Sequence, residues 1–140
     1  MSEVYFFGQI VLAIILGGVL GWQRTHLGKP AGLRTYALVT AGATLFTILS
    51  VVAFSDDTAR VAANIVTGIG FLGAGMILHK QNHIEGLTTA AGLWMAAAIG
   101  MAIGLQYYIL ATATTVVVLL LLMIDDSRLK SPKRARASDR

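Results

Sequence analysis

Long stretches of this chain contain no charged residue. Residues 35–55, 61–79 and 86–124 hold no Asp, Glu, Lys or Arg, and residues 4–22 are equally free of charge. Uncharged apolar runs of about 18 residues or more are typical of helices that cross a lipid bilayer. Only 13% of the chain is charged, against roughly 25% in an average soluble domain. The chain is therefore predicted to be an integral membrane protein.

The longest uncharged run is predicted to hold two membrane spans. As one helix, residues 87–124 would extend about 57 Å at about 1.5 Å per residue, nearly twice a hydrocarbon core of roughly 30 Å. The predicted fold class is an all-α integral membrane protein, a five-span transmembrane helical bundle with glycine and small-residue packing seams. The transmembrane domain is predicted over residues 1–124, with spans at about 4–22, 36–54, 61–78, 87–103 and 107–124.

The basic residues predict the orientation of these spans. With five spans, the first loop, the third loop and the C-terminal tail share one side of the membrane, and they hold every Lys and Arg except Arg60. Cytoplasmic loops are enriched in Lys and Arg, so we expect a periplasmic N-terminus and a cytoplasmic C-terminus. Residues 125–140 are too polar to fold alone and are predicted to be a disordered basic tail. Anionic lipid is expected to bind the basic loop and tail.

Small residues recur at helical spacing within the spans. Glycines four residues apart let two helix backbones approach closely in a bilayer. A homodimer through such a small-residue seam is expected. The helix-packing positions are Gly17, Gly21, Gly68, Gly70, Gly73, Gly75, Gly92, Gly100 and Gly104.

Hydroxyl side chains form a stripe along the second span. The hydroxyls could bond back to carbonyls four residues earlier, as is common in membrane helices. They could instead form a polar seam that faces a cavity or a partner. The seam residues are Thr40, Thr44 and Thr47, with Thr67 on the third span.

The third span carries a polar edge. Arg60 and Asn64 are four residues apart, which places them on one helical face. Arg60 could pair with Asp56 or Asp57, or it could reach toward Asn64. Polar groups inside a membrane are candidates for function by default, although a packing hydrogen bond would explain Asn64 equally well.

Several chemistries find no support in the sequence. Gly68-Ile-Gly-Phe-Leu-Gly73 has the spacing of a dinucleotide fingerprint, but that motif requires a preceding strand, and here it lies within a span. No pair of a nucleophile and a base is visible, so we expect neither catalysis nor a cofactor, and we expect no nucleic-acid partner. The chain contains no cysteine, which excludes disulfides and thiolate metal sites.

Two histidines are weak candidates for metal ligands. His79 and His83 have a spacing that would place both imidazoles on one face of a helix, and Glu85 could supply a third ligand. The segment is short and polar and ends at Gly86, so solvated loop histidines are the simpler interpretation. No metal site is predicted elsewhere.

The predicted spans contain no Asp or Glu. Mg²⁺ prefers carboxylate and carbonyl oxygens, and proton-coupled carriers use buried acids. A conventional coupled cation transporter is therefore disfavoured, while a pore lined by hydroxyls and carbonyls stays open.

Four blocks of sequence carry a family resemblance when they are taken together. They are Gly-Lys-Pro-Ala-Gly-Leu-Arg-Thr (28–35), Ala-Leu-Val-Thr-Ala-Gly-Ala-Thr-Leu-Phe-Thr (37–47), Gly-Ile-Gly-Phe-Leu-Gly-Ala-Gly (68–75) and Gly-Leu-Thr-Thr-Ala-Ala-Gly-Leu-Trp (86–94). In this order and spacing they resemble the MgtC/SapB family of bacterial inner-membrane proteins. The resemblance implies a small helical domain linked to adaptation to low magnesium. It also implies a regulator of other membrane proteins rather than a magnesium pump.

The chain departs from the family pattern in two places. Gln23 stands where the family usually has an acidic residue before Arg24, which puts any pairing by that acid in doubt. Many relatives also continue into a soluble C-terminal domain, whereas this sequence continues into the basic residues 125–140.

Two functions are therefore expected as alternatives. The first is a regulatory protein that docks against other inner-membrane proteins in magnesium homeostasis or stress. The second is a small oligomeric channel or transporter for Mg²⁺ or another cation. Arg24, Lys29 and Arg34 could be topology determinants alone, or they could bind phosphate, a lipid headgroup or an acidic partner. The expected functional cluster is Arg24, Arg34, Arg60, Asn64, Thr88 and Trp94.

Overall fold

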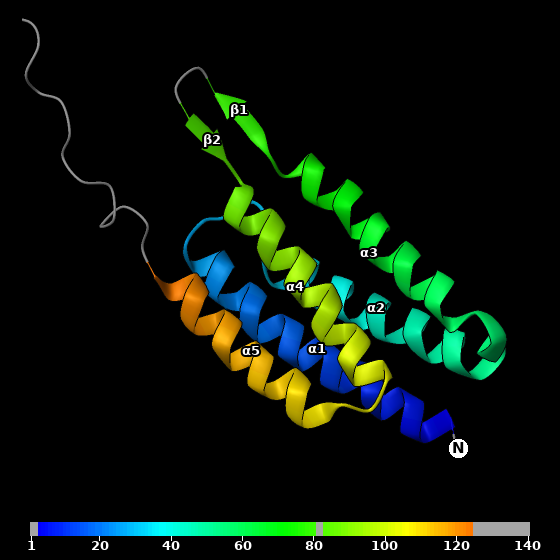
Figure 1. Ribbon diagram of the computed structural model, residues 1–140. Helices are drawn as coiled ribbons and strands as arrows, with labels where there is room; N and C mark the ends of the chain where they lie inside the picture. The colour runs from blue at the N-terminus through cyan, green and yellow to red at the C-terminus, as the bar shows by residue number, and fades with distance from the viewer. Residues whose placement is uncertain (1–2, 81–82, 125–140) are drawn as a thin grey trace, which may run out of the picture.

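A computed structural model describes residues 3–80 and 83–124 of the chain. The part of the chain so described is a helical bundle with one small hairpin (Figure 1). The predicted all-α membrane character is confirmed at this level, and the predicted tail lies outside the described residues. The elements are α1 (Glu3–His26), α2 (Leu33–Ala53), a 3-10 turn η1 (Ser55–Asp57), α3 (Thr58–Gly75), β1 (Leu78–Lys80), β2 (His83–Glu85), α4 (Leu87–Gly104) and α5 (Tyr108–Met123).

The helices differ in how well they suit a membrane. Within the described ranges, α1, α2 and α4 are long and apolar enough to cross a bilayer, with mean hydropathies of 2.1, 1.9 and 1.5 in their 18-residue windows. Helix α5 is apolar but has only 16 residues. Helix α3 does not meet the same measure and begins three residues before the predicted span, so that it includes Arg60. By length and composition, three of the five predicted spans are supported.

Helices α1, α2 and α4 form the centre of the bundle. Helix α5 lies beside α1 and α4, and α3 lies on the other side against α4 and α2 (Figure 1). The largest fully buried side chains sit where α1, α2 and α4 meet. They include Leu20, Tyr36, Leu93, Ile99 and Ile103.

Glycines allow the central helices to approach each other closely. A methyl group at Gly17 would lie 2.7 Å from the carbonyl oxygen of Tyr36, and one at Gly21 would lie 2.6 Å from the Cα of Leu33. Real Cβ atoms essentially never come under 3.0 Å, so these positions require glycine. The same crowding by side chains or backbone of α2 occurs at Gly92, Gly100 and Gly104 on α4.

The glycines of α3 differ from the expectation of close packing. Gly73 makes an ordinary contact, because a Cβ there would lie 3.6 Å from the Cβ of Ala90. Gly68, Gly70 and Gly75 have nothing within 4 Å of an added Cβ. Helix α3 packs on the bundle through Ile65 and Ile69, which share a buried cluster with Ala43 of α2 and Ala97 of α4.

The threonine stripe of α2 lies inside helix contacts. Thr40, Thr44 and Thr47 are buried, and each hydroxyl donates to the carbonyl four residues earlier. The Thr44 hydroxyl is also 2.8 Å from the carbonyl oxygen of Gly100, across the interface with α4. Thr67 bonds back to Ala63 but is exposed on α3. Back-bonding, the simpler of the two interpretations of this stripe, accounts for Thr40, Thr47 and Thr67, whereas the Thr44 hydroxyl also reaches a neighbouring helix.

Replacing Thr44 by valine is expected to lower the free energy of unfolding by about 1 kcal/mol, because the bond to Gly100 joins two helices in a low-dielectric core. Thr67→Val is the control, since that hydroxyl bonds only within its own helix. Denaturant unfolding in mild detergent measures both. Equal stability of the two variants would contradict the assignment of Thr44 to an interhelical bond.

The segment predicted as the third loop is a hairpin. Strands β1 and β2 pair antiparallel, with Leu78 opposite Glu85 and Lys80 opposite His83. Gly86 then enters α4 with a φ of +85°, a backbone conformation that glycine adopts without strain. The hairpin replaces the helical face that would have brought His79 and His83 together. The side chains of these histidines lie outside the described part of the chain.

Candidate functional site

The six residues of the expected functional cluster lie in separate places. Arg24 and Thr88 line one cavity at the end of the bundle where α1 ends and α4 begins, which we call the Arg24 end. Arg34 is exposed at the start of α2, and Trp94 is exposed on α4. Arg60 and Asn64 belong to the first half of α3, which begins at the opposite end of the bundle (Figure 1).

Arg24 is a buried cation. Its side chain is only 3% exposed, and its Nη2 donates a hydrogen bond of 3.0 Å to the hydroxyl of Thr89. Its Nε has no acceptor among the described residues. Thr89 in turn is 1% exposed, and its carbonyl oxygen lies 3.4 Å from the Tyr36 hydroxyl, which donates to it. Arg24 thus joins α1 to the first turn of α4, and no carboxylate of residues 3–80 or 83–124 is paired with it.

Gln23 joins α1 to the end of α5. Its Nε2 donates to the carbonyl oxygen of Leu122 at 2.9 Å, while its Oε1 is buried without a partner. An ionised carboxylate at this position could not donate to that carbonyl. An acidic side chain, which the MgtC/SapB pattern usually has at this position, could make the hydrogen bond to Leu122 only in its protonated form.

The cavity at the Arg24 end has a volume of about 300 Å³. Arg24, Lys29 and Thr88 supply its polar groups. Its apolar wall consists of Leu27, Leu122, Met123 and Ile124. The polar part of this lining therefore consists of two basic side chains and one hydroxyl, with no acidic side chain among the lining residues.

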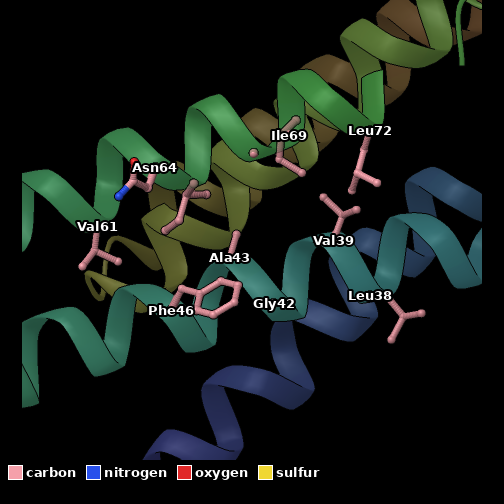
Figure 2. A pocket seen from close by; sticks show the side chains of 11 residues that line it. Leu38, Val39, Gly42, Ala43, Phe46, Val61, Asn64, Ile69 and Leu72 are labelled. Atoms are coloured by element: carbon pink, nitrogen blue, oxygen red, sulfur yellow. The ribbon is translucent and has the colours of Figure 1, made fainter. Parts of the chain in front are cut away.

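A larger apolar groove of about 460 Å³ separates α2 from α3. Val39 from α2 and Leu72 from α3 project toward the space between the two helices (Figure 2). Asn64 is an exposed residue of α3 that belongs to the lining. Several lining residues are open to the surroundings, with Leu38 73% and Phe46 57% exposed. Asn64 is the one polar side chain among the lining residues.

Arg60 pairs with an acid of the preceding turn. Its Nε is 2.8 Å from Oδ2 of Asp57, and the two side chains are 78% and 49% exposed. Of the three expected partners, Asp56, Asp57 and Asn64, the structure pairs Arg60 with Asp57. Exposed ion pairs of this kind contribute about 0–1 kcal/mol to stability. Arg60 therefore lies on the surface of the bundle and is not part of a buried site.

Sequence reasoning missed Thr89, which is the residue that holds Arg24. The expected cluster contained Thr88, one position away on α4, because Thr88 falls within the family-like block 86–94. Thr88 is exposed at the cavity while Thr89 faces the core. The phase of a helix that is apolar on all sides cannot be read from its sequence, because the apolar pattern selects no face.

Comparison with known proteins identifies the family. A model described as the MgtC family matches residues 10–129. The chain belongs to the MgtC family. The resemblance seen in the four sequence blocks is thus confirmed.

Two MgtC-family relatives are described by name. The chain is 46% identical over 114 residues to the "Putative magnesium transporter YhiD" of Escherichia coli K12, covering 75% of this chain and 53% of that protein. It is 44% identical over 105 residues to "Protein MgtC" of Salmonella typhimurium LT2, covering 75% and 46%. The chain spans about half the length of the curated relatives it matches. No solved structure matches the chain.

Both candidate sites lie within the MgtC-family match. Residues 10–129 include Arg24, the groove around Asn64 and the cavity wall up to Ile124. The match therefore covers the bundle as a whole rather than one motif. Helices of this length and hydropathy in an MgtC-family chain make it a bacterial membrane protein.

Proposed function

We propose that this chain is an inner-membrane protein of magnesium homeostasis that acts by binding another membrane protein, not by carrying an ion. The open groove between α2 and α3, with Asn64 among its lining residues, carries the proposal. The names of the relatives supply the link to magnesium.

The described residues offer few ligands for a transported cation. Their acidic side chains lie in the first turn of α1 or in the connections between helices. No three His, Asp or Glu side chains of the described chain gather as a metal site. Because Mg²⁺ prefers oxygen ligands with negative charge, this distribution favours a binding role. The residues concerned are Glu3, Asp56, Asp57 and Glu85.

The groove suits a transmembrane helix better than lipid. Gly68 on its α3 side has nothing within 4 Å, which leaves room for a second backbone at close range. A lipid chain could fill the apolar space but could not hydrogen-bond the amide of Asn64. A transmembrane helix with a polar side chain of its own could both fill the apolar space and hydrogen-bond the Asn64 amide. We therefore assign the groove to a span of another inner-membrane protein.

The basic residues support a five-span topology for this role. Arg24 and Lys29 lie at the end of the bundle where α5 ends, and Arg60 lies at the other end (Figure 1). The enrichment of cations on the cytoplasmic side then gives a periplasmic N-terminus. The same topology makes the Arg24 end cytoplasmic.

The test compares two glycines that have equal space but different locations. Gly68 lines the groove, whereas Gly18 on α1 lies outside it, and neither has a heavy atom within 4 Å of an added Cβ. In a bacterium deleted for its own MgtC-family gene, we expect Gly68→Leu and Asn64→Leu to lose growth at low magnesium. Gly18→Leu should retain that growth at equal protein level. Normal growth of the Gly68→Leu strain would refute the docking role.

Transport is the alternative, favoured by the printed name of the Escherichia coli relative. An oligomer would be needed to close a path around Asn64. Mg²⁺ flux into liposomes holding the purified protein distinguishes the two functions, and we expect no saturable flux. Saturable flux that Asn64→Ala abolishes would establish transport instead. Because the chain has no cysteine, a single Gly68→Cys variant would also reveal by cross-linking whether a second copy occupies the groove.

A further inference from the structure

The Arg24 end contains a buried positive charge that no described residue neutralises. Arg24 is 3% exposed and hydrogen-bonds only to the neutral hydroxyl of Thr89. The described ion pair, between Arg60 and Asp57, lies at the opposite end of the bundle. Buried charges in proteins are normally paired or bind an ion. Among the residues that the structure describes, none supplies an anion to Arg24.

The polar residues that line this cavity can all act as hydrogen-bond donors. Lys29 contributes a flexible ammonium from the α1–α2 loop, and Thr88 contributes a hydroxyl. Helix α4 is 18 residues long and begins here. Its N-cap residue is Gly86, which has no side chain to cap the free backbone N–H groups of the first turn. The positive end of its dipole favours an anion at this position. Glu85, the acidic residue that directly precedes the Gly86 cap of α4, is not among the residues that line the cavity.

We propose that this cavity binds a phosphate group. A guanidinium offers two parallel donors to phosphate oxygens, and an ammonium adds a point charge. The apolar wall of Leu122, Met123 and Ile124 suits the glycerol and acyl carbons beside a phospholipid headgroup. The phosphate can belong to an anionic lipid or to a free phosphate ion. The site is separate from the α2–α3 groove and does not depend on the docking function.

Two carboxylates of the chain itself could compete with an external anion. They belong to Asp125 and Asp126, which follow Ile124 directly in the sequence. Either carboxylate would remove the need for an external ligand if it entered the cavity. The double variant Asp125→Asn/Asp126→Asn separates this possibility from the proposal.

Two exposed cations form the matched pair for the test. Lys29 lines the cavity and Arg34 does not, yet both belong to the same basic segment. The purified full chain is titrated with phosphatidylglycerol or phosphatidylcholine, and retained lipid is measured by native mass spectrometry. Lys29→Met is expected to weaken phosphatidylglycerol binding about fivefold, and Arg24→Met at least about tenfold. Arg34→Met should bind like the wild type.

A second arm identifies the source of the phosphate. Inorganic phosphate is added to the delipidated protein, and its thermal unfolding is followed. A rise in Tm with phosphate that Lys29→Met reduces would assign the site to the free ion. Retention of phosphatidylglycerol alone would assign it to the lipid headgroup.

Three outcomes would overturn the proposal. One is that the wild type retains phosphatidylglycerol no better than phosphatidylcholine and also shows no rise in Tm with inorganic phosphate. Another is that Arg34→Met loses as much binding as Lys29→Met, which would indicate general surface attraction. The third is binding that appears only in Asp125→Asn/Asp126→Asn, which would assign the cavity to the chain's own carboxylates.

Discussion

Replacing Gly100 by alanine is expected to lower the free energy of unfolding by about 1–3 kcal/mol. The added Cβ would overlap the carbonyl oxygen of Thr40 and would lie 2.9 Å from the Cβ of Ala43. Because the first obstacle is backbone, no side chain can rotate away, and α2 must separate from α4. The same separation would stretch the bond between Thr44 and the Gly100 carbonyl, which is 2.8 Å long.

Gly68→Ala is the matched control for this change. It adds the same methyl group to a helix of the same length, but Gly68 has nothing within 4 Å. Alanine is favoured over glycine in a helix by about 1 kcal/mol, so the control should be as stable as the wild type or slightly more stable. Unfolding of both variants in one detergent gives the comparison. If both lose the same stability, the α2–α4 contact is not as close as the structure places it.

Replacing Gly86 by alanine is expected to have a still larger effect, about 2–5 kcal/mol, from the sum of backbone strain and overlap. Gly86 has a φ of +85°, and a Cβ there would overlap the carbonyl oxygen of Met76. The hairpin would have to leave the start of α4, where Thr89 holds Arg24. Thermal unfolding of the purified variant measures the loss.

Gly28→Ala isolates the two contributions. Gly28 has a φ of +62° but nothing within 4 Å, so its substitution adds only the backbone strain of about 1–2 kcal/mol. The difference between the two variants then measures the contact with Met76. If Gly86→Ala is as stable as Gly28→Ala, the backbone around Met76 moves aside without any loss in the free energy of unfolding.

The positions of most helices followed from the sequence, because a bilayer permits very few backbone structures. Residues that carry no charge for a span's length had to be helical, and the islands between them had to hold the turns. The bounds of α4 and α5 lie within one residue of the predicted spans, whereas α1 continues four residues further and α3 begins and ends three residues earlier. The hairpin was missed because strands of three residues are too short to show an alternating pattern.

The candidate sites were less predictable, because they depend on which elements meet. Arg24 follows an apolar span and has the sequence signature of a topology determinant, yet the first turn of α4 covers it. The glycines of α3 had the spacing of a packing seam, and spacing does not say which helix will meet that seam. In this structure Gly68 meets none in the described chain, and this is the observation on which the docking proposal rests.

The unequal lengths of neighbouring helices have a consequence for the surrounding lipid. Helix α1 has 24 residues and α5, which packs beside it, has 16. At about 1.5 Å per residue these are roughly 36 Å and 24 Å long. If α5 is the fifth span, a hydrocarbon layer of about 30 Å is thicker than this helix is long, and local thinning of the bilayer along that side of the protein would accommodate the difference. The chain should accordingly partition into the thinner regions of a mixed membrane, with α5 facing the most compressed lipid.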